Sequence, residues 1–143
     1  MNILHLIPSL DYCSAAAQLG LLSKHFPDAH AMHICCLGGE GPWAARLRQQ
    51  GRTVDCLHWT RVFEPTPPWT LHRLLKAESP DVIHAWGLPA LRALGLVGRR
   101  WLSRTVVSQP LSHRLKQVGP FDRWLLRRAR SVAASSQAEA ALC

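Results

Sequence analysis

Short hydrophobic runs alternate with longer amphipathic stretches along the chain. Short runs bounded by proline, glycine or polar turns are typical of buried strands, and longer stretches with leucines three or four residues apart are typical of helices. We predict six strands, at residues 2–7, 31–37, 53–58, 82–85, 105–108 and 132–134. We predict six helices, at residues 15–26, 43–50, 69–77, 88–102, 121–128 and 136–142.

Residues with special backbone preferences mark several boundaries. Ser14 is suited to cap the first helix, and Pro27 follows its end. Pro42 is suited to the first turn of the second helix, and Gly51 to its C-terminal end. Residues 60–68 contain three prolines, which predicts a loop.

Strands that alternate with helices at this spacing need crossover connections and therefore form a parallel sheet. Right-handed crossovers then predict an α/β fold, a Rossmann-like doubly wound sheet of about six strands with helices on both faces, in the strand order 3-2-1-4-5-6. The 143 residues fit a single domain over residues 1–143. Ligands of such sheets bind beyond the carboxyl ends of the strands, where the order reverses. This rule selects residues 8–18, 84–88 and 109–113.

The composition narrows the class of protein and its partners. Hydrophobic residues make up 48% and charged residues 18%, as in soluble α/β proteins. The N-terminus lacks the pattern of a signal peptide, so we expect a cytoplasmic location. The 17 basic and 9 acidic residues give a net charge of +8, which favours anionic partners such as phosphates, acidic lipids or nucleic acid without choosing among them. Nucleic acid is not expected, because no recognised binding motif is present and aromatic residues total 7%.

The cysteines and histidines predict no metal site. The five cysteines show no CxxC spacing and are odd in number, which argues against zinc and against a disulfide framework. Six of the eight histidines show no metal-ligand spacing and are interpreted as structural or surface residues: His5, His25, His30, His33, His58 and His72. We predict no metal and no cofactor.

Four segments together resemble a known family. They are ILHLIPSLD at residues 3–11, CLGGEGP at 36–42 followed by ARLRQQG at 45–51, PDVIHAW at 80–86 and SVAASS at 131–136. In this order and at these separations, they resemble the N-terminal domain of glycosyltransferase family 4, retaining enzymes of GT-B architecture. The resemblance implies that this domain holds the sugar acceptor, and that a C-terminal GT-B domain, absent here, binds most of the nucleotide sugar.

The first loop departs from the family pattern. The family commonly has two glycines before the first helix, whose N-terminus meets the donor diphosphate. Here Cys13 and Ser14 stand in the glycine positions and Ala16 in an acidic one, while Gln18 is retained. The resemblance implies substrate contacts by Ser14, Ala15 and Gln18. A plain helix cap at Ser14 and a solvent-facing Gln18 explain these residues equally well.

Three further positions are candidate substrate-binding residues. His84, after the fourth strand's apolar run, either bonds an acceptor hydroxyl or is a structural histidine bonded to a carbonyl. Trp86 is either a platform for a sugar or lipid or a residue packed against a helix. Gln109 stands where the family often carries histidine, and its amide can bind an acceptor but cannot transfer a proton. No catalytic residue is predicted.

The basic stretch 114–130, with Trp124, Leu125 and Leu126 interleaved, suits either contact with an anionic membrane at its inner face or a solvated helix.

The sequence leaves two candidate functions. The first is the acceptor-binding half of a retaining glycosyltransferase that moves a sugar from a nucleotide sugar to a hydroxyl, inactive alone. The second is a non-catalytic Rossmann-like module that binds carbohydrate, lipid or protein, which the altered first loop and Gln109 favour.

Overall fold

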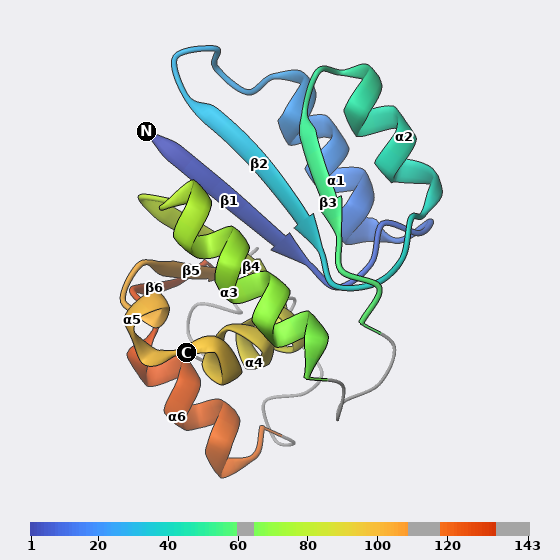
Figure 1. Ribbon diagram of the computed structural model, residues 1–143. Coiled ribbons are helices and arrows are strands. Elements are labelled where there is room, and N and C mark those ends of the chain that lie inside the picture. Colours follow the sequence, from blue (N-terminus) through green and yellow to red (C-terminus); the bar gives the residue numbers. More distant parts are fainter. Residues whose placement is uncertain (60–64, 109–117, 134–143) are drawn as a thin grey trace.

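Six parallel strands form one sheet in the computed structural model, which describes residues 1–59, 65–108 and 118–133 (Figure 1). The strands are β1 (Asn2–Ile7), β2 (Ala31–Cys36), β3 (Thr53–Cys56), β4 (Val82–Trp86), β5 (Thr105–Ser108) and β6 (Ser131–Ala133). Their order is β3-β2-β1-β4-β5-β6, and every pairing between them is parallel. The predicted fold class and strand order are therefore confirmed.

Helices cover the two faces of the sheet in two groups. They are α1 (Ser14–Lys24), α2 (Pro42–Gln49), α3 (Thr66–Glu78), α4 (Leu88–Val97), α5 (Arg99–Leu102) and α6 (Pro120–Arg128). Side chains of α1 and α2 share one core with Ile7 and Ile34, and those of α3 to α6 share the other with Leu4, Leu6 and Ile83. Figure 1 shows α3 crossing in front of the sheet and α1 behind β3. Alternate residues of β1 thus serve opposite cores, as strand geometry requires.

The start of α1 differs by one residue from the prediction. The Cys13 backbone is extended, and its carbonyl already accepts a hydrogen bond from the Ala17 amide at 3.1 Å. Cys13 therefore occupies the capping position and Ser14 is the first helical residue, so the prediction of Ser14 as the cap is wrong. The Cys13 side chain forms no capping hydrogen bond with the rest of the described chain.

Two other helix boundaries were also predicted wrongly. Residues 66–68 belong to α3 rather than to a loop, because the prolines at 67 and 68 fall in the first turn, where a missing N–H costs nothing. The single helix predicted over 88–102 is interrupted at Gly98, whose φ of 147° and ψ of 143° are far from helical values. Residues 60–64 and the helix predicted at 136–142 lie outside the described residues.

A buried histidine ties α3 to the sheet. His33 on β2 is 6% exposed, and its Nε2 lies 2.6 Å from Asp55 Oδ2 on β3. Its Nδ1 lies 3.2 Å from Glu78 Oε2, at the last residue of α3. These contacts fix the end of α3 at the amino-terminal edge of the sheet.

The loop after β1 packs directly on the loop after β2. Leu10 is fully buried, and its carbonyl accepts a hydrogen bond from the Trp43 amide at 3.1 Å. A Cβ atom at Gly41 would lie 2.3 Å from the Leu10 carbonyl oxygen and 2.7 Å from the Asp11 nitrogen. The close approach of two backbones therefore requires glycine at position 41.

We expect Gly41→Ala to lower the free energy of unfolding by about 1–3 kcal/mol, because the added methyl group displaces backbone rather than a flexible side chain. Urea denaturation measures this. The matched control is Gly119→Ala: Gly119 also precedes a proline at a helix start, and its Cβ would meet no atom of the described residues within 4 Å. Equal losses in the two variants would contradict the proposed steric role of Gly41.

Candidate functional site

The strand order reverses at β1, which lies between β2 and β4. The loops that leave the carboxyl ends of β1 and β4 diverge to opposite sides there, which is where doubly wound sheets bind ligands. Ala15 on α1 and Trp86 at the end of β4 both pack against the core of the α1 face. The first loop and the end of β4 therefore border the same region of the fold.

Four polar side chains from three neighbouring strands form a hydrogen-bonded cluster on this face. The sheet register pairs His5 of β1 with His84 of β4, and Trp86 of β4 with Ser108 of β5. The Nδ1 atoms of His84 and His5 lie 3.2 Å apart, and His84 Nε2 lies 2.8 Å from Ser108 Oγ. Trp86 Nε1 donates to His5 Nδ1 at 3.3 Å. We call these four residues the histidine cluster.

The chemistry of the groups assigns the protons in the histidine cluster. An indole N–H can only donate, so His5 Nδ1 is an acceptor and the proton of neutral His5 is on Nε2. His84 Nδ1 must then donate to His5 Nδ1, which leaves His84 Nε2 as an acceptor for the Ser108 hydroxyl. Ser108 therefore donates toward His84, and its oxygen lone pairs remain able to accept a hydrogen bond.

Both rings of the histidine cluster are neutral at physiological pH. Burial, with a further contribution from the charge on His84, lowers the pKa of His5 to about 3. Burial lowers the pKa of His84 to about 4. A neutral imidazole with so low a pKa is a weak base, so the cluster is suited to binding and orienting a hydroxyl group rather than to transferring its proton.

The first turn of α1 carries no negative side chain, and the carboxylate of Asp11 in the loop before it accepts a hydrogen bond from the Ser9 hydroxyl. Residues 14–17, the first turn, contain no acidic residue. Ser14 and Gln18 are exposed and Ala15 is half-buried. The backbone N–H groups of a helix start carry a partial positive charge and suit an anion.

The structure brings some predicted site residues together and leaves others apart. His84 and Trp86 lie side by side, with ring centroids 4.6 Å apart. His84 bonds to an imidazole and a hydroxyl, not to a carbonyl as its structural interpretation held. Gln109 lies outside the described residues, and Ser14, Ala15 and Gln18 have no hydrogen bond to the cluster within the described ranges.

Sequence reasoning did not select His5 or Ser108 as site residues. His5 was interpreted as structural or surface, and it is 2% exposed. The period-two alternation of a strand would have placed it on one face with Ile7, but its partners depend on which strands are neighbours and in which register. Within residues 1–59, 65–108 and 118–133, no group of three or more His, Cys, Asp and Glu side chains could hold a metal ion.

We expect the free energy of unfolding to fall as pH drops from about 6.5 toward 4. The histidine pKa values are lower in the folded state, so the unfolded chain binds more protons in this range, by up to about 1.4 kcal/mol per pH unit for each histidine. His84→Gln removes one of these groups and should give a shallower slope. Urea denaturation between pH 4 and 7 measures it, with the exposed His25→Gln as the control. Parallel slopes for wild type and His84→Gln would contradict the assignment of a neutral, buried His84.

The comparisons with known proteins agree with this fold. A crystal structure of HepE from Anabaena in complex with UDP and glucose superposes with a TM-score of 0.72 at 18% sequence identity. The match covers 99% of this chain and 40% of HepE, so the chain spans less than half the length of that protein. No curated protein sequence matched. The family model of Glycosyltransferase Family 4 matches residues 15–143, and the chain therefore belongs to that family.

Proposed function

We propose that this chain is the acceptor-binding half of a retaining glycosyltransferase that moves a sugar from a nucleotide sugar to a hydroxyl acceptor. The observation that carries the proposal is the histidine cluster at the strand-order reversal, in a chain of a glycosyltransferase family. The UDP and glucose bound to HepE support a nucleotide-sugar donor. The nucleotide sugar is a substrate, and no cofactor is proposed.

The acceptor hydroxyl is proposed to bind at Ser108 and His84. Because the Ser108 hydroxyl donates to His84, its oxygen is left to accept a hydrogen bond from the acceptor. The half-buried Trp86 ring supplies an apolar surface for a sugar face, and the neighbouring Gln109 adds amide donors and acceptors. His84 holds the Ser108 hydroxyl in place, and the transfer of the acceptor proton falls to another group.

The donor diphosphate is proposed to lie at the start of α1, near Ser14 and Ala15, with Gln18 one turn further on. The absence of acidic residues in this turn leaves the positive end of the helix uncompensated. The Cβ atom of Cys13, where the family has glycine, keeps the phosphates farther from the backbone. A C-terminal GT-B domain is proposed to supply the remaining donor contacts, and residues 1–143 alone should not turn over nucleotide sugars.

A binding module without catalysis is the second candidate function. It is favoured by the replacement of the first-loop glycines and by the low histidine pKa values, which leave the cluster without an acid or strong base near neutral pH. Such a module would bind carbohydrate, lipid or protein. Turnover by the complete gene product separates the two functions.

We expect Ser108→Ala in the complete protein to lower kcat/KM for the acceptor about tenfold, because one hydrogen bond to the acceptor is lost. The KM for the nucleotide sugar should not change. UDP release from UDP-glucose, followed by a screen of other donors, measures both constants. The control is Ser131→Ala, an exposed serine on β6. If Ser108→Ala changes only the donor KM, the acceptor assignment is wrong; if the complete protein turns over no donor, the binding-module function replaces the enzyme.

Contact with an anionic membrane at the cytoplasmic face is proposed for α6. Buried Asp122 forms two hydrogen bonds with Arg92, at 2.7 and 2.6 Å, which anchor α6 to α4. Phe121 is 51% exposed and stacks on Trp124, with ring centroids 6.1 Å apart. An exposed aromatic residue among arginines suits the interface of an acidic bilayer. No helix in the described part of the chain is long and apolar enough to cross a membrane.

We expect Arg123→Gln to weaken binding to phosphatidylglycerol vesicles about fivefold, since a basic residue near an acidic surface contributes about 1 kcal/mol. Phe121→Ser should weaken it further through lost apolar burial. Sedimentation with vesicles measures both effects. The control is Lys24→Gln, which removes one positive charge from another helix, α1. Equal weakening by Lys24→Gln would indicate a response to net charge alone.

A further inference from the structure

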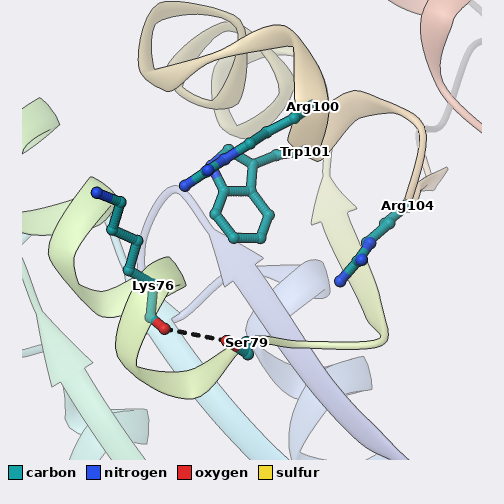
Figure 2. A pocket seen from close by; sticks show the side chains of 5 residues that line it. All are labelled: Lys76, Ser79, Arg100, Trp101 and Arg104. Carbon is teal, nitrogen blue, oxygen red and sulfur yellow. Dashed lines mark hydrogen bonds between the residues drawn. The ribbon is translucent and has the colours of Figure 1, made fainter.

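A pocket opens at the edge of the sheet opposite the histidine cluster. It has a volume of about 270 Å³ and is lined by Lys76, Ser79, Arg100, Trp101 and Arg104 (Figure 2). Lys76 and Ser79 come from the end of α3, Arg100 and Trp101 from α5, and Arg104 from the turn before β5. Because these segments lead into the amino ends of β4 and β5, the pocket is separate from the proposed acceptor and donor sites.

Three positive charges meet in this pocket without a compensating carboxylate. Within the described residues, none of Lys76, Arg100 and Arg104 forms an ion pair. Arg104 Nη1 donates to the Pro80 carbonyl at 3.2 Å, which holds the guanidinium at the rim. The Arg100 guanidinium lies 4.5 Å from the centroid of the Trp101 ring. Unpaired cations gathered in a concave site attract an anion strongly.

A buried donor lines the same pocket. Trp101 is 6% exposed, and its Nε1 has no hydrogen-bond partner among the described residues. Figure 2 shows the indole extending between Lys76, Ser79 and Arg104, with Arg100 across its upper end. An indole nitrogen can only donate, and native proteins pair nearly all buried donors. Because the nitrogen itself exposes almost no surface, an acceptor atom of a ligand would satisfy it once a lining side chain moves aside.

The lining selects the chemistry and size of the ligand. Guanidinium groups bind phosphate through two parallel hydrogen bonds, and an ammonium group adds a point charge. A volume of about 270 Å³ lies just below the roughly 300–1,000 Å³ of sites that enclose drug-sized ligands. The pocket therefore suits one phosphate group with a small organic part and is too small for a complete nucleotide sugar.

We propose that Lys76, Arg100, Trp101 and Arg104 form a binding site for a small soluble phosphate ester, distinct from the glycosyltransferase site. The arginines and the lysine bind the phosphate oxygens, and the Trp101 N–H donates to one of the ligand's acceptors. This proposal does not depend on the proposed transferase function, and either proposal can be wrong while the other is right.

The test follows the indole N–H resonances of the chain by ¹H–¹⁵N NMR while inorganic phosphate, and then glycerol 3-phosphate, is added. Trp101→Phe identifies the Trp101 resonance among those of the six tryptophans. We expect this resonance to shift in a saturable manner, with the other indole signals little changed. Chloride at equal ionic strength is the reference, and the same shift with chloride would mean an adventitious ion only and overturn the proposal.

Arg100→Gln should weaken phosphate binding at least about tenfold, because a charge-assisted hydrogen bond to the ligand is lost. Lys76→Gln should also weaken phosphate binding. Because Lys76 is exposed, this variant tests the site even if Arg100→Gln has a folding defect. The matched control, Lys24→Gln on α1, removes the same charge elsewhere and should change the Kd less than about twofold.

Two further results would overturn the proposal. One is equal weakening of phosphate binding by Lys24→Gln and Arg100→Gln, which would mean a response to the net charge of +8 rather than to the pocket. The other is a Trp101 shift that phosphatidylglycerol vesicles produce and the soluble phosphates do not, which would indicate a lipid head group as the source of the phosphate. A shift with both soluble phosphates, lost in Arg100→Gln, supports the proposed site.

Discussion

Right-handed crossovers make the sheet grow in one direction from β1 through β2 to β3, and in the other from β4 to β6. This constraint places β1 between β2 and β4, and so brings two strands far apart in sequence into register at His5 and His84. It also places the starts of the helices that follow β1, β2 and β4 at one edge of the sheet and their ends at the other, where α5 begins after α4. The proposed acceptor and donor sites lie at the edge formed by the carboxyl ends of the strands. The proposed phosphate-binding pocket lies at the edge formed by their amino ends.

The histidine cluster shows how a parallel sheet can hold polar side chains inside a mostly apolar layer. His5 and His84 remain neutral because burial disfavours their charged forms, and each ring then has one donor and one acceptor to offer its neighbours. With Trp86 as a fixed donor, one arrangement of protons fits the three hydrogen bonds, and it leaves the buried His5 Nε2–H without a partner among the described residues. The Ser108 hydroxyl is thereby oriented before any ligand arrives, which lowers the entropic cost of binding.

Much of the fold follows from the sequence pattern, and less of the site does. The strands at 2–7 and 105–108 were predicted to the residue because apolar runs and turn residues bound them locally. The helix break at Gly98 was missed, since a glycine inside a helical pattern is often tolerated and only its backbone angles reveal the interruption. The partners of His84, and the meeting of Lys76 with Arg100, depend on strand neighbours and crossovers, which no local pattern encodes.

The interruption at Gly98 also determines which indole each of two adjacent arginines meets. Arg99 lies 5.0 Å from the Trp124 ring on α6, whereas Arg100 lies 4.5 Å from the Trp101 ring in the phosphate pocket. Successive residues of a short helix point about 100° apart, so one helical step separates the two surfaces. A single-residue insertion or deletion before Arg99 would turn both side chains by about 100° and move each away from the indole that it now contacts. The length of this four-residue helix is therefore constrained as well as its sequence.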